Sequence, residues 1–163
     1  MKETKRSLSS LVERISAQEE FWRKLLKKDV DVRSGLHYPR IFNNPKPEEV
    51  SVILIIPRID SLLQILLQKC EEVVGVNSYL EARDIAELTH TEGPTTNYIL
   101  WHSGLEKPDY FSISASESRY MATKTPGRRT MNLTERLAFG LQFFDEHEAW
   151  PDTNTETLCA PSE

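Results

Sequence analysis

The pattern of apolar and polar positions along the chain predicts three helices. In each of them, apolar residues recur every three or four positions, as on the buried face of an amphipathic helix. Asn132 followed by Glu135 has the spacing of a capping box, Ser61 precedes the second apolar stripe, and Gly75 is typical of a helix end. The predicted helices span residues 10–27, 61–74 and 132–146.

The apolar stripe of the first predicted helix is interrupted. It includes Ile15 and Trp22 but lapses at Gln18 and Glu19. An amphipathic helix buries its stripe, either against its own domain or against a second copy of the protein. We favour packing on the domain, and a homodimer through helix 10–27 is the alternative.

The third predicted helix carries a glycine on its apolar stripe. Gly140 lies among large apolar residues of segment 132–146. A glycine inside a helix costs about 1 kcal/mol relative to alanine. Its presence there predicts the close approach of another backbone.

Two short apolar runs predict strands. The run VSVILII at residues 50–56 is apolar on both faces, which is typical of a central strand, and NYILWHS at residues 97–103 predicts another. Between them lie helix 61–74 and a shorter helical pattern, YLEARDIAELTH, at residues 79–90. The order strand, helices, strand is that of a crossover connection. We therefore expect one α+β or α/β domain over residues 1–150, with a small mixed sheet whose central strand at 50–56 is packed by the three helices. Residues 151–163 are expected to form an acidic, polar tail that is either loose or part of a longer chain.

Composition places this chain among soluble globular proteins. It has 163 residues, of which 39% are hydrophobic and 28% charged, enough for one folded core. The longest apolar run is far shorter than the roughly 20 residues of a membrane span. No apolar stretch of signal-peptide type follows the charged N-terminus, and the two cysteines fit reduced thiols. We expect a cytoplasmic protein without membrane contact.

Charge is distributed unevenly along the chain. The net charge is −5, but residues 1–46 hold 11 basic and 6 acidic side chains, whereas residues 47–163 hold 9 basic and 19 acidic ones. An acidic globular part disfavours a general nucleic-acid role, because such a role needs a basic face to neutralise phosphates. The basic excess near the N-terminus is expected to contact either an acidic partner or the acidic part of its own chain.

No motif in the chain specifies a reaction. The turn PRIDS at 57–61 lacks the glycines of phosphate-binding loops, and the four histidines lack metal-site spacing, so we expect neither a cofactor nor a metal. His102 is a weak candidate for an acid or base. It cannot form a nucleophile pair with Ser103, because adjacent residues of a strand point to opposite faces.

One basic segment stands out against the acidic second part of the chain. Residues 119–129 contain no acid, and Asn132 then begins a helix whose N-terminal amides favour anions. The predicted anion-binding residues are Arg119, Lys124, Arg128, Arg129 and Asn132. The alternative is that these cations pair with surplus acids of the same domain, around a turn made by Pro126 and Gly127.

Two hypotheses for function follow. The first is a non-catalytic binding or interaction domain that recognises an anionic small molecule or an acidic protein through residues 119–132. The second is a small hydrolase or transferase that acts on a phosphorylated substrate, with His102 as acid or base. The lack of a nucleophile motif, a metal motif or a glycine-rich loop favours the first hypothesis.

Overall fold

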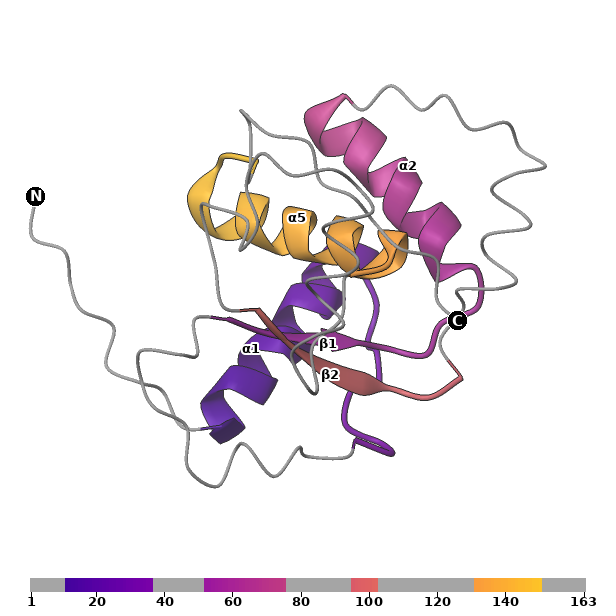
Figure 1. The fold of residues 1–163 in the computed structure, drawn as a ribbon, viewed down its shortest axis with the longest axis vertical. Coiled ribbons are helices and arrows are strands. Elements are labelled where there is room, and N and C mark those ends of the chain that lie inside the picture. Colours follow the sequence, from indigo (N-terminus) through magenta and orange to yellow (C-terminus); the bar gives the residue numbers. More distant parts are fainter. Residues whose placement is uncertain (1–10, 37–51, 76–94, 103–130, 151–163) are drawn as a thin grey trace, which may run out of the picture. The chain divides into compact units, whose positions relative to one another are not determined.

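The computed structural model describes residues 11–36, 52–75, 95–102 and 131–150. In these ranges the chain forms three helices and two strands, so the fold is mixed α+β, as predicted. The elements are α1 (Leu11–Leu26), β1 (Val52–Ile56), α2 (Leu62–Val74), β2 (Tyr98–His102) and α5 (Leu133–His147) (Figure 1). They belong to two compact units, one with α1, β1 and β2 and the other with α2 and α5. A single domain over residues 1–150 with a tail at 151–163 stays a prediction.

The two strands pair in antiparallel fashion. Leu54 lies opposite Leu100, and Ile55 lies opposite Ile99. A crossover connection joins parallel strands, whereas antiparallel strands need no crossover. The pairing of β1 with β2 therefore belongs to an α+β fold and not to an α/β crossover unit.

Strand β1 is buried on both faces, as its sequence predicted. Ile53, Leu54 and Ile55 are all at least nine-tenths buried. In addition, Ile55 has its backbone groups bound by α1. Its N–H donates to Oε1 of Gln18 at 2.9 Å, and its carbonyl accepts from Nε1 of Trp22 at 2.8 Å. Because both backbone groups of one strand residue point to the same side, α1 covers an edge of β1.

These two bonds explain the interrupted stripe of α1. Ile15, Gln18 and Trp22 are all buried, at spacings of three and four, so they share one face of the helix. Gln18 occupies a core position because a buried backbone N–H needs an acceptor. In contrast, the apolar side chain of Val12 is 66% exposed.

The segment after α1 is held by side-chain hydrogen bonds to the backbone. Oδ1 of Asp31 accepts from the N–H groups of Arg33 and Ser34, and the amide of Asn97 donates to the carbonyls of Asp31 and Ser34. Val32, which lies between Asp31 and Arg33 in the sequence, is fully buried. Hydrogen bonds from Ser34, through its side chain and its backbone, and from the backbone of Arg33 lower the pKa of Asp31. Asn97, directly before β2, thus holds a turn that is distant from it in sequence.

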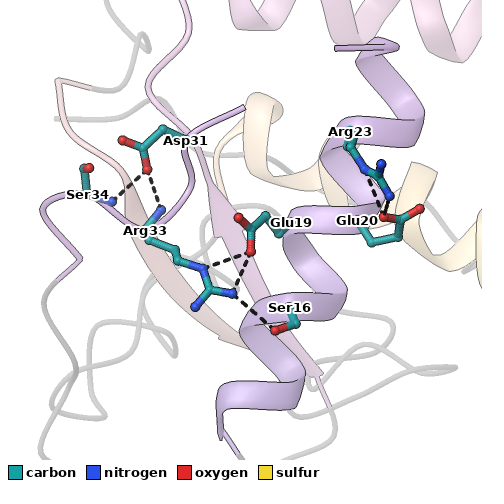
Figure 2. A network of polar contacts seen from close by, with 7 residues as sticks. All are labelled: Ser16, Glu19, Glu20, Arg23, Asp31, Arg33 and Ser34. Atoms are coloured by element: carbon teal, nitrogen blue, oxygen red, sulfur yellow. Dashed lines mark hydrogen bonds and ion pairs between the residues drawn. The ribbon is translucent and has the colours of Figure 1, made fainter. Parts of the chain in front are cut away.

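The same turn is tied to α1 by an exposed polar network (Figure 2). The guanidinium of Arg33 donates to Oε2 of Glu19 at 2.6 and 2.9 Å and to Oγ of Ser16 at 3.2 Å. Glu20, the residue after Glu19, forms an ion pair with Arg23 one turn later on α1. Exposed pairs of this kind contribute at most about 1 kcal/mol each, so the network orients the turn more than it stabilises the fold.

In the second unit, α2 buries one stripe. Leu62, Leu63, Leu66 and Cys70 are buried, whereas Val73 is 41% exposed. Gly75 ends the helix in the left-handed conformation, as predicted, and its N–H donates to the carbonyl of Glu71. Ser61 precedes the helix as predicted, but its side chain makes no cap hydrogen bond.

The more deeply buried helix is α5, which packs against α2. Every residue from 134 to 142 is buried, whereas a surface helix would bury a single stripe. The polar members of this run are Thr134, Glu135, Arg136 and Gln142. Over residues 134–142, α5 therefore carries these polar side chains into the interior of its unit.

Gly140 makes room for an aromatic ring, not for a second backbone. A Cβ added at this position would overlap ring atoms Cζ2 and Cη2 of Trp150, a residue that follows α5. The prediction of a close approach is confirmed, but its partner is a side chain. The indole of Trp150 lies against the helix where the glycine leaves space for it.

The overlap predicts that the effect of alanine at position 140 depends on Trp150. With Trp150 present, we expect Gly140→Ala to lower the free energy of unfolding by about 1 to 3 kcal/mol, because the ring must move. In a Trp150→Ala background, the same change should raise stability by up to about 1 kcal/mol through helix propensity. Denaturant unfolding of the wild type and the three variants measures both effects. Equal effects in the two backgrounds would contradict the packing of Trp150 on Gly140.

Candidate functional site

The candidate site lies at the N-terminus of α5. Asn132 is the N-cap residue, and its side chain accepts a hydrogen bond from the N–H of Glu135 at 2.8 Å. In return, Oε2 of Glu135 accepts from the N–H of Asn132 at 3.0 Å. The predicted capping box is therefore confirmed, and both residues are buried.

The capping box changes the expected anion site. The amides of Asn132 and Glu135 are already bonded within the box, and the carboxylate of Glu135 lies at the positive end of the helix dipole. The carboxylate of Glu135 thus already fills part of the helix end at which an anionic ligand was expected to bind. The amides of Leu133 and Thr134 take no part in the box. An external anion at this helix end would need these amides and additional positive side chains.

Thr134 is the unusual residue of the first turn. It is 1% exposed, and no described residue offers its Oγ1 a hydrogen-bond partner. Side chains of a helix lean toward its N-terminus, so this hydroxyl belongs to the same helix end as the capping box. Burial of a hydroxyl without a partner costs about 1 to 3 kcal/mol. A buried hydroxyl of this kind is therefore expected to have a functional role.

Further along α5, Arg136 carries a charge into the interior. Its guanidinium carbon lies 5.5 Å from the ring centroid of Phe139 and 6.0 Å from that of Trp150, distances at which a cation is attracted to an aromatic face. Arg136 is only 8% exposed. Its charge also acts on Cys70 of α2. Burial raises the pKa of the Cys70 thiol to about 12, and the nearby cation of Arg136 opposes part of this rise. The thiol of Cys70 is therefore protonated near neutral pH and is not a nucleophile there.

The other predicted site residues are not placed by the structure. Arg119, Lys124, Arg128 and Arg129 lie outside the described residues, and so does Ser103. His102 is the last residue of β2 and pairs with Val52 of β1, but the position of its side chain is outside the description. Among the predicted residues, only Asn132 can be assigned a contact at this site.

Sequence reasoning missed Thr134 and Arg136. Both belong to the helix that follows the basic segment, but an isolated polar residue in an amphipathic helix is ordinarily interpreted as part of the solvent face. A weak signal was available. The apolar residues of α5, which include Phe139, Leu141, Phe143 and Phe144, are spread around more than one face, as in a helix that is enclosed.

Comparisons with known proteins assign no relative to this chain. No protein-family model, no curated protein and no solved structure matches it. Within the described ranges, no helix is both long enough and apolar enough to cross a membrane. In the same ranges, no group of three or more His, Cys, Asp or Glu side chains could hold a metal ion.

Proposed function

We propose that this protein is a non-catalytic binding domain that recognises an anionic ligand through residues 119–132 and the first turn of α5. The observation that carries this proposal is the buried hydroxyl of Thr134, for which the described residues offer no partner. Its hydroxyl proton, the helix dipole and a preceding segment rich in arginine are all suited to a phosphate or carboxylate.

The capping box makes the arginines essential to this proposal. Because Glu135 already brings a negative charge to the helix end, the helix dipole alone would attract a second anion only weakly. Arg128 and Arg129 stand only four and three residues, respectively, before Asn132 in the sequence. They are the nearest basic residues before Asn132 in the sequence, and their charges could outweigh the carboxylate of Glu135.

A competing explanation is that the basic segment neutralises acids of its own domain. Residues 47–163 hold 19 acidic and 9 basic side chains, so internal partners are numerous. In that case the arginines stabilise the empty protein, and no anion raises its melting temperature. The two explanations predict opposite results for the same variant.

Melting curves of the wild type and of an Arg128→Ala, Arg129→Ala double variant distinguish them. We expect phosphate or an organic phosphate, at constant ionic strength, to stabilise the wild type; at a hundred times the dissociation constant the gain is about 2.7 kcal/mol. The double variant should lose this gain while its stability without ligand changes by less than about 1 kcal/mol. A wild type that is indifferent to both kinds of anion would contradict the proposal.

Thr134→Val provides a matched test within the described site, because valine has a similar shape without the hydroxyl. We expect this variant to be as stable as the wild type or more so in the absence of anion, since a buried hydroxyl without a partner is removed. We also expect it to respond less to phosphate. If Thr134→Val instead lowers the stability of the empty protein, the hydroxyl has a partner within the fold and is not available to a ligand.

A further inference from the structure

A second buried polar side chain of α5 has an atom that the described residues do not satisfy. Gln142 is 8% exposed, and no described residue offers its side-chain oxygen Oε1 a hydrogen-bond partner. An amide oxygen only accepts hydrogen bonds, so Oε1 requires an N–H or O–H donor. A buried acceptor without a donor is costly, as is the buried hydroxyl of Thr134. Gln142 therefore joins Thr134 as a residue whose burial calls for a partner.

Thr134 and Gln142 lie on one face of α5. Thr134, Ala138 and Gln142 follow one another at intervals of four residues, which turn the helix by only about 80° in total. All three side chains are buried, and Ala138 is fully so. We call this part of the helix the Thr134–Gln142 face. It has a polar group at each end and only a methyl group between them.

The length of the Thr134–Gln142 face sets the distance between its two polar groups. Eight residues rise by about 12 Å along a helix axis. The longer side chain of glutamine leans toward the helix N-terminus, which places the two oxygens about 8 to 12 Å apart. The threonine end belongs to the first turn, where the helix dipole favours an anion, whereas the glutamine end requires a donor. The two ends of the face thus recognise different chemical groups.

We propose that the ligand of α5 is an extended phosphomonoester that carries an amide N–H about 8 to 12 Å from its phosphate. The phosphate binds at Thr134, because its several oxygens accept from the hydroxyl and from other donors at once. The amide N–H donates to Oε1 of Gln142. No large side chain of this face separates the two ends, since Ala138 carries only a methyl group. This inference rests on the proposed function and specifies the ligand class of the same site.

A competing explanation is that a donor from outside the described ranges of the same chain serves Gln142. In that case Oε1 stabilises the empty protein, and a ligand gains nothing from an amide at that distance. Gln142→Met distinguishes the two explanations, because methionine is a flexible side chain of similar length that has no amide. We expect the empty variant to melt at the same temperature as the wild type or higher, since a buried acceptor without a donor is removed.

The binding experiment uses the full chain and three probes in isothermal titration calorimetry. The probes are inorganic phosphate, acetamidohexyl phosphate and acetoxyhexyl phosphate. The two organic probes have equal length, but only the acetamido compound has an N–H, which an extended hexyl chain holds about 10 Å from the phosphorus. We expect the wild type to bind this amide about tenfold more tightly than the ester, because its N–H satisfies a buried acceptor.

Two variants assign this preference to Gln142. Gln142→Met should bind the amide and the ester equally well and should bind inorganic phosphate as the wild type does. Gln64→Met is the matched control, since it makes the same exchange at an exposed position of α2 in the same unit. We expect the control to keep the tenfold preference for the amide.

Other results would overturn the proposal. If the wild type binds inorganic phosphate but does not prefer the amide to the ester, the extended ligand is wrong and the proposed anion site is retained. If no phosphate-bearing probe binds, the proposed function fails, and this inference fails with it. If Gln142→Met lowers the melting temperature of the empty protein, or if Gln64→Met loses the preference equally, Oε1 of Gln142 is not the acceptor for a ligand.

Discussion

Trp22→Ala is expected to lower the free energy of unfolding by about 3 to 5 kcal/mol, at any protein concentration. The side chain is fully buried, lies in edge contact with Phe21 and donates its indole N–H to the carbonyl of Ile55. The substitution removes a large apolar volume and leaves a buried carbonyl without its donor. Denaturant unfolding at several protein concentrations measures the loss.

Trp22→Phe separates the two contributions. Phenylalanine keeps much of the ring volume but has no N–H, so we expect a loss of about 1 to 3 kcal/mol, smaller than for alanine. The concentration series also tests the alternative of a homodimer through helix 10–27, which stays a prediction. If dilution of the wild type removes the difference from Trp22→Ala, the stripe of α1 is an interface between two copies and does not belong to the core of one.

Ile55→Ala is the second substitution with a large expected effect, a loss of about 2 to 5 kcal/mol. The Ile55 side chain is fully buried, and its backbone is the point where α1 is bonded to the sheet. Alanine would leave a cavity beneath this junction. Because the backbone groups remain, the loss reports side-chain packing and not the two hydrogen bonds.

Ile99→Ala is a matched control for this second substitution. Ile99 lies directly opposite Ile55 on β2 and has the same side chain, but it is only partly buried. We expect a clearly smaller loss, about 1 kcal/mol, in proportion to the smaller apolar area that Ile99 removes from water. Equal losses at the two positions would mean that Ile55 is less enclosed than its burial indicates.

Several features of this protein could be predicted from sequence because their partners are near in the chain. The capping box of Asn132 and Glu135 joins residues three apart, and Gly75 ends α2 through a bond to Glu71 four residues earlier. The burial of Leu54 followed from an unbroken apolar run. For the candidate site the sequence located the start of the helix correctly, but the arginines expected around it lie outside the described residues.

Features with distant partners could not be predicted in this way. Gln18 interrupts an apolar stripe, and nothing within α1 indicates that its acceptor serves a backbone N–H 37 residues later in the chain. The exposure of Thr134 likewise depends on what encloses α5 and not on the residue itself. Gly140 was recognised as a point of close approach, but only the structure shows that Trp150 fills the space.

The sequence by itself thus determined the type of each helix and strand, the start of α5 and the end of α2. These follow from backbone groups that need partners within one helical turn and from apolar side chains that avoid water. Tertiary structure alone decided the antiparallel pairing of β1 with β2, the role of Gln18 and the burial of Thr134. The physical reason is that a polar group buried by folding must find its partner wherever the folded chain places one, and spacing along the sequence carries no record of that position.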